Sequence, residues 1–175
     1  MNQKHRKPNR LKEYDYSQGG YYFVTICTKD KTDYFGKIED GNVFLNEYGN
    51  IVHVQWLWLE KQYEYVKLDE FIIMPNHFHG ILIIEDGGFE SVVTGRDLSL
   101  QPKRKTKPLS GLIGAFKTVS SKMIHRNGSL DFAWQRSFYD HIIRNERSLD
   151  EIREYIQNNP MRWELDRGNL ENLHL

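Results

Sequence analysis

The chain has 175 residues, 24 basic and 24 acidic side chains, and a formal net charge of zero. This length is typical of one domain with a single apolar core, and the balanced charge excludes a protein that is basic throughout. The single cysteine, Cys27, excludes an internal disulfide and fits a reducing compartment.

The N-terminal segment is charged and lacks the apolar stretch of a secretory signal, and no apolar run approaches the ~18 residues of a membrane helix. We therefore expect a cytoplasmic protein without a membrane partner. Basic side chains cluster at residues 1–12 and 101–108, where no acidic side chain accompanies them. Such clusters either contact phosphates or form a solvated surface. We expect one domain over residues 1–175, with a core at about 14–165, a basic tail at 1–12 and a mobile basic loop at about 86–107.

The first elements predicted along the chain are a strand, a hairpin and a helix. Aromatic and β-branched residues at 21–28 (YYFVTICT) predict the strand. Asp40-Gly41 lies between two apolar stretches within residues 36–45, which is a strong signal for a β-hairpin. Asn46 is expected to cap a helix that ends near Gln62.

Two further strands are predicted at 66–74 and 77–84, and Pro75-Asn76 separates them because proline cannot donate to a strand ladder. Residues 85–107 are polar, basic and contain glycine, so we expect a long mobile loop there. Apolar residues at helical spacing then predict a helix from Ser110 to about Arg126.

Asn127-Gly128 is expected to end this helix, and a short strand is expected at Tyr139–Ile143. Ser148 and Glu151 form a capping-box pattern for a last helix, which we expect to end by Pro160. This order of elements favours an α+β fold with helices packed on a mainly antiparallel sheet, in a ferredoxin-like (RRM-like) arrangement.

Two histidines in the strand at 77–84 are the first candidates for chemistry. His77 and His79 are two residues apart, so a strand projects both imidazoles from the same face. A pair of neutral imidazoles held in this way is half of a metal site. Core histidines that donate hydrogen bonds to carbonyl groups would give the same pattern.

Residues of the last helix are candidates to complete the site. Tyr155 and Asn159 are four residues apart and share one helix face, beside the buried stripe. With His77 and His79, the Asn159 amide oxygen would make three metal ligands and leave positions open for a substrate. The simpler interpretations are an ordinary amphipathic-helix tyrosine and a helix stop.

These residues lie in motifs that resemble the single-tyrosine HUH transposases, and more specifically the REP-associated tyrosine transposases. The matching segments are YFVTICT at 22–28, MPNHFH at 74–79, WQ at 134–135, DHII at 140–143 and YIQNNP at 155–160. They follow the family's order over nearly the whole chain. His-x-His alone is a weak signal, whereas its combination with the tyrosine motif is specific.

The resemblance implies a metal-dependent transposase that cleaves and rejoins single-stranded DNA. Tyr155 would be the nucleophile and form a 5′-phosphotyrosine link, His77 and His79 would bind Mg²⁺ or Mn²⁺, and Asn159 would be the third ligand. Many relatives have Gln in place of this Asn, so Asn159 departs from the family pattern. The chemistry is consistent, since a tyrosine with a pKa near ~10 needs a polarised phosphate as its target.

The partner implied by the resemblance is single-stranded DNA that forms hairpins, and the family contains both monomers and homodimers. His141 is a candidate general base because it is a titratable residue within a matched motif. The candidate DNA contacts are basic residues from the two clusters and from the region around the last strand: Arg10, Lys103, Arg104, Lys105, Arg136 and Arg144.

Two other functions fit parts of the pattern. One is a non-catalytic, RRM-like module that binds single-stranded nucleic acid through its aromatic and basic residues. The other is a hydrolase in which His77 and His79 hold zinc, which requires a third His, Cys or carboxylate ligand. Glu154 and Asp140 are the nearest candidates in the sequence for that third ligand.

Overall fold

A computed structural model describes residues 14–85, 89–94, 97–102 and 106–166, and side chains within 14–85 and 106–163. The strands predicted at 66–74, 77–84 and 139–143 have those bounds in the structure. The elements in chain order are β1 (Gly20–Cys27), a short 3-10 helix (Lys29–Lys31), β2 (Gly36–Glu39), β3 (Asn42–Leu45), α1 (Glu47–Gln62), β4 (Val66–Met74), β5 (His77–Ile84), β6 (Phe89–Thr94), β7 (Asp97–Pro102), α2 (Leu109–Arg126), β8 (Tyr139–Ile143) and α3 (Glu146–Asp166).

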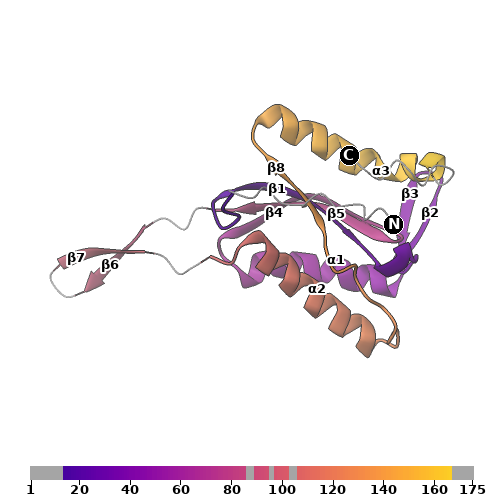
Figure 1. The fold of residues 1–175 in the computed structure, drawn as a ribbon, viewed down its shortest axis with the longest axis horizontal. Helices are drawn as coiled ribbons and strands as arrows, with labels where there is room; N and C mark the ends of the chain where they lie inside the picture. Colours follow the sequence, from indigo (N-terminus) through magenta and orange to yellow (C-terminus); the bar gives the residue numbers. More distant parts are fainter. Residues whose placement is uncertain (1–13, 86–88, 95–96, 103–105, 167–175) are drawn as a thin grey trace, which may run out of the picture.

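The main sheet has four strands in the order β4-β5-β1-β8, and every neighbouring pair is antiparallel. β1, α1, β4, β5, α2 and β8 follow the β-α-β-β-α-β succession of a ferredoxin-like fold. This confirms the fold class predicted from the sequence. α1 and α2 cover one face of the sheet, and α3 lies across the opposite face (Figure 1).

Two apolar cores lie on the two faces of the sheet. Along β1, Tyr22 and Val24 belong to the larger core beneath α1 and α2, whereas Phe23 points to α3, because successive strand residues alternate between faces. Trp56 from α1 and Phe116 from α2 are fully buried in the larger core. The smaller core joins α3 to the sheet through Phe23, Ile81, Ile143, Leu149 and Ile156.

Local turn and cap signals act as predicted in the first half of the chain. Asp40 and Gly41 connect β2 and β3 and have positive φ angles of 50° and 71°, as a tight hairpin turn of the mirror-image type requires. The Asn46 side chain accepts a hydrogen bond from the Gly49 amide at 3.0 Å and caps α1.

The prediction of a loop without secondary structure at 85–107 is wrong. β6 and β7 pair as an antiparallel hairpin that is separate from the main sheet and extends away from it (Figure 1). The short alternation of Leu98 and Leu100 in β7 is a strand pattern that the polar and basic composition of the segment concealed.

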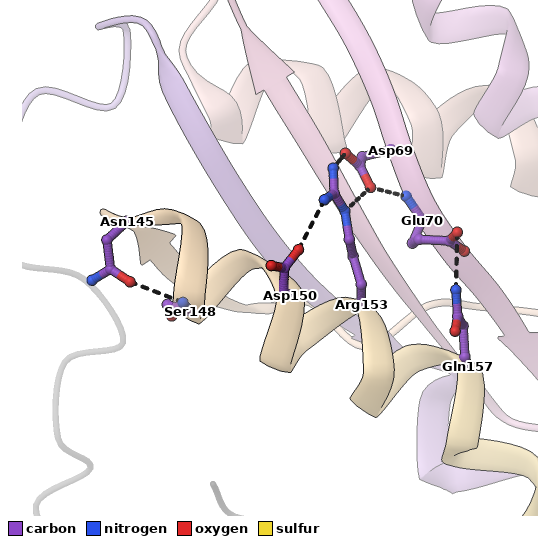
Figure 2. A network of polar contacts seen from close by, with 7 residues as sticks. All are labelled: Asp69, Glu70, Asn145, Ser148, Asp150, Arg153 and Gln157. Atoms are coloured by element: carbon purple, nitrogen blue, oxygen red, sulfur yellow. Dashed lines mark hydrogen bonds and ion pairs between the residues drawn. The ribbon is translucent and has the colours of Figure 1, made fainter.

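Both predicted ends of the last helix are also wrong. α3 begins before Ser148, whose amide donates to the Asn145 side chain at 2.9 Å, so Asn145 performs the capping role (Figure 2). The helix continues through Pro160 to Asp166. A proline inside a helix removes one backbone hydrogen bond, and its ring crowds the carbonyl four residues earlier. Here Pro160 is buried and Trp163 packs against His77 of the sheet, so tertiary contacts accompany the continued helix. Within the described residues, no helix combines the length and apolar character needed to cross a bilayer.

Candidate active site

His77 and His79 of β5 face α3, and their side chains are each only 2% exposed. The intervening Phe78 points the other way and packs on Trp56, with 4.5 Å between ring centroids. Because Phe78 is fully buried in the larger core, the alternation of the strand directs both histidines to the α3 side. The imidazole centroids of His77 and His79 lie 4.7 Å apart.

The Nδ1 atom of His77 is fixed by Asn76. It lies 2.9 Å from the Asn76 amide oxygen, and the Asn76 amide nitrogen donates to the Lys31 carbonyl at 3.0 Å. This second bond orients the amide so that its oxygen faces the ring, and Nδ1 of His77 must therefore be the donor. In the neutral ring, Nε2 then carries the lone pair.

His79 has an equivalent partner in Thr25, which lies opposite it on β1. The Thr25 hydroxyl is 2.8 Å from Nδ1 of His79. When Nδ1 donates to this hydroxyl, the lone pair of His79 also lies on Nε2. The Nε2 atoms of His77 and His79 are both buried without a hydrogen-bond partner among the described residues, an arrangement that costs roughly 1–3 kcal/mol per group unless a ligand uses the lone pair.

Burial keeps both imidazoles neutral near pH 7. It lowers the pKa of His77 to about 4, and the nearby Asn159 side chain opposes part of this shift. The pKa of His79 is lowered well below 6.5, again chiefly by burial and secondarily by His77. Neutral imidazole is the form that binds metals, so the environment selects the ligating state.

Tyr155 and Asn159 reach these histidines from α3. The partly buried Tyr155 ring meets the His79 ring edge-on, with 5.3 Å between centroids. Phe23 stacks on His79 at 5.5 Å and contacts the Tyr155 ring at 6.0 Å. Asn159 is only 8% exposed, and its side chain lies close enough to His77 to raise that residue's pKa. The structure thus brings together the four residues that the sequence singled out.

Trp163, Thr25 and Asn76 were not predicted from the sequence as residues of this site. Trp163 lies against His77, with 5.4 Å between ring centroids. Its spacing of four residues from Asn159 was a usable signal, but the expected stop at Pro160 hid it. Thr25 and Asn76, which contact the Nδ1 atoms, were missed because a hydrogen-bond partner of an imidazole has no sequence signature, and Thr25 is distant from His79 in the sequence.

Of the six predicted DNA contacts, the structure describes Arg136 and Arg144. Arg136 precedes β8 and Arg144 follows it, and both side chains are exposed. Arg10, Lys103, Arg104 and Lys105 lie outside the described residues. His141 is exposed on edge strand β8, where it pairs with Phe23 and therefore shares the sheet face that carries His79.

The donor set fits a divalent cation. Two imidazole nitrogens with available lone pairs and a neighbouring amide oxygen are ligands that Mn²⁺ accepts readily, while Mg²⁺ prefers oxygen. In the described part of the chain, no group of three His, Cys, Asp or Glu residues is placed to hold a metal. The Asn159 amide, which lies beside His77, is the candidate for a third ligand.

Comparison with known proteins shows which proteins this chain resembles. A Haemophilus influenzae protein described as "Putative REP-associated tyrosine transposase" is 24% identical over 148 residues, which cover 85% of this chain and 74% of that protein. The solved structure of a REP-associated tyrosine transposase bound to a REP hairpin matches with a TM-score of 0.58 at 18% identity, covering 88% of this chain and 73% of that chain. The chain therefore has structural and distant sequence similarity to REP-associated tyrosine transposases, as the sequence motifs predicted.

A second relative shows the immediate family. An uncharacterized protein of Haemophilus influenzae is 41% identical over 165 residues, which cover 93% of this chain and 92% of that protein. The chain belongs to the same family as this Haemophilus protein. No protein-family model matches the chain.

Proposed function

We propose that this protein is a metal-dependent DNA transposase that cleaves and rejoins single-stranded DNA through a covalent 5′-phosphotyrosine. The observation that carries the proposal is the convergence of Tyr155 on His79 and of Asn159 on His77, beside two buried Nε2 atoms without hydrogen-bond partners. Hairpin-forming DNA is the proposed substrate, because the similar transposase of known structure is bound to a REP hairpin.

His77 and His79 would hold the cation through Nε2, with the Asn159 amide oxygen as the third protein ligand. A bound Mn²⁺ or Mg²⁺ would neutralise and polarise a DNA phosphate. Thr25 and Asn76 keep the two rings in the ligating tautomer and orientation, as outer partners of metal-binding histidines commonly do. Phe23 and Trp163 limit the access of water to the two rings.

Tyr155 supplies the nucleophile. Its phenol oxygen forms a bond to phosphorus while the bond between phosphorus and the 3′ oxygen breaks, and the proton lost by the phenol is balanced by the one gained by the leaving oxygen. The products are a 5′-phosphotyrosine and a free 3′-hydroxyl. Attack by a 3′-hydroxyl from another strand reverses the step, so that strands are joined without ATP.

The direct test is incubation of the protein with hairpin-containing single-stranded DNA and Mn²⁺. A covalent protein–DNA band is expected on a denaturing gel, and EDTA should abolish it. The Tyr155→Phe variant should bind the DNA and give no band. Persistence of the band in that variant would assign the nucleophile to another residue.

The same experiment separates the other functions considered for this fold. A non-catalytic nucleic-acid-binding protein would bind the DNA equally well with EDTA and form no adduct under any condition. A zinc hydrolase requires a third His, Cys or carboxylate beside His77 and His79, and the part of the chain that the structure describes offers none.

A further inference from the structure

β4 contains a β-bulge that directs two acidic residues toward α3. Leu68 pairs with Leu82 and Phe71 pairs with Gly80, so the single residue Ile81 opposes two residues of β4. Those two residues are the acidic pair Asp69-Glu70. Ile81 belongs to the core beneath α3, and both acidic side chains reach the same helix (Figure 2).

Asp69 and Arg153 form a two-pronged ion pair across this interface (Figure 2). Arg153 donates from Nε to Oδ1 of Asp69 at 2.9 Å and from Nη2 to Oδ2 at 2.6 Å. The Glu70 amide also donates to Oδ1 of Asp69 at 2.6 Å, and Gln157 donates to the Glu70 carboxylate at 3.1 Å. Hydrogen bonding to Arg153 lowers the pKa of Asp69, so the carboxylate stays ionised at neutral pH.

Arg153 and Tyr155 lie on opposite flanks of α3. At about 100° per residue, Arg153 and Gln157 are each roughly 160° around the helix from Tyr155. The apolar residues Ile152 and Ile156 lie between the flanks and pack on the sheet. One flank is tied to β4 through Asp69, and the other carries Tyr155 against Phe23 of β1 and His79 of β5.

An apolar stripe determines which face of a helix packs on a sheet, but it defines small rotations about the helix axis less sharply than a directional contact does, because the hydrophobic effect is non-directional. A bidentate guanidinium–carboxylate pair is directional. Fixing one flank of α3 therefore fixes the rotation of the helix, and with it the position of the opposite flank.

We propose that Asp69 and Arg153 are positioning residues that set the rotation of α3 and thereby hold the Tyr155 phenol beside His79. This inference rests on the proposed function of Tyr155 as the nucleophile. The two residues touch neither substrate nor metal in this scheme, and they act through the helix that carries Tyr155.

The chain offers a matched control on the same helix. Arg147 pairs with Glu151 one turn away at 3.0 Å, with side chains 89% and 63% exposed. That pair lies within α3 and does not link it to the sheet, so it cannot set the rotation of the helix. Arg147→Gln removes the same charge from α3 as Arg153→Gln and leaves the link to β4 intact.

The experiment compares wild type, R147Q, R153Q and D69N as full chains. Single-turnover adduct formation with hairpin DNA and Mn²⁺ gives a rate at saturating DNA and a half-saturating DNA concentration. We expect R153Q and D69N to lower the saturated rate at least tenfold while the half-saturating concentration changes less than twofold, with R147Q like wild type. The double variant D69N/R153Q should be no slower than R153Q, because R153Q alone already removes the link to Asp69, together with the bond from Nη1 of Arg153 to Asp150 within α3 at 3.1 Å.

A second measurement requires no activity. In protein labelled with 3-fluorotyrosine, the ¹⁹F resonance that Y155F removes belongs to Tyr155 and senses the adjacent His79 and Phe23 rings. We expect this resonance to shift in R153Q and D69N and to stay in place in R147Q, with all variants folded by circular dichroism.

An unmoved Tyr155 resonance in R153Q and D69N would overturn the inference, as would saturated rates equal to that of R147Q. A loss of rate matched by an equal loss of DNA affinity would likewise assign the pair a general structural role. If wild type itself forms no adduct, the proposed function fails, and the ¹⁹F comparison still decides whether the pair positions Tyr155.

Discussion

The ring of Tyr155 stands edge-on to the imidazole of His79, with 5.3 Å between centroids and 71° between planes. The two residues come from α3 and β5, which are separated along the chain by β6, β7, α2 and β8. Their contact places the proposed nucleophile beside the strand that carries the proposed metal ligands.

Replacing Tyr155 by Phe removes one oxygen and keeps the ring that packs on Phe23 and His79. We expect adduct formation to disappear. The free energy of unfolding should change by less than about 1 kcal/mol, because the apolar contacts of the ring persist. Binding of Mn²⁺, measured by calorimetry, should match that of wild type. A large loss of stability would indicate that the hydroxyl has a structural role instead.

Metal binding should stabilise the folded protein. The buried Nε2 atoms of His77 and His79 have no hydrogen-bond partner among the described residues, and a bound cation would give them one. At a Mn²⁺ concentration one hundred times the Kd, the free energy of unfolding should rise by about 2.7 kcal/mol. Thermal denaturation with Mn²⁺ and then with excess EDTA measures this, and the increase should be absent from the double variant His77→Ala/His79→Ala.

The stability of the metal-free protein should depend on pH through His77. Its pKa falls from 6.5 to about 4 on folding, so the unfolded state binds more protons between these values. The contribution of neutral His77 to the free energy of unfolding is therefore fully present above pH 6.5. It is lost as the pH falls toward 4, by up to about 3 kcal/mol. Burial also lowers the pKa of His79, so this residue too stabilises the folded protein less as the pH falls.

Urea unfolding in EDTA at several pH values measures this dependence. The variant His77→Gln, which cannot titrate, should show a shallower decline below pH 6.5 than wild type. Parallel curves for the two proteins would contradict the assignment of the decline to His77.

Asn159 should contribute to metal affinity through its amide oxygen. Asn159→Leu is close to it in size and lacks the oxygen, and we expect it to weaken Mn²⁺ binding roughly 10-fold or more. Asn159→Gln restores an amide that is one methylene longer and should retain affinity. Equal affinity of the Leu variant and wild type would remove Asn159 from the ligand set.

Sequence patterns predicted most of the strands, turns and helix caps, because residues close together in the chain determine these features. The Asp40-Gly41 turn, the Asn46 cap and the break at Pro75-Asn76 each depend on residues within a few positions of one another. The alternation of β5 likewise placed His77 and His79 on one face. These features could be predicted without knowledge of tertiary contacts.

The remaining features depend on contacts between distant segments. α3 continues beyond Pro160, and Trp163 in its last turns packs on His77. No local sequence rule predicts this contact. The bulge at Asp69-Glu70 is visible only from the register between β4 and β5. The partnership of Thr25 with His79 requires knowing that β1 lies beside β5.

The position of α3 at the end of the fold has a consequence during synthesis. A ribosome that has released the chain through β8 has delivered every strand of the sheet and both histidines, but not Tyr155. Such a nascent chain lacks the proposed nucleophile, so under the proposed mechanism it could not become covalently attached to DNA. It would, however, expose Phe23, Ile81 and Ile143, which α3 later covers, so incomplete chains should be prone to aggregate.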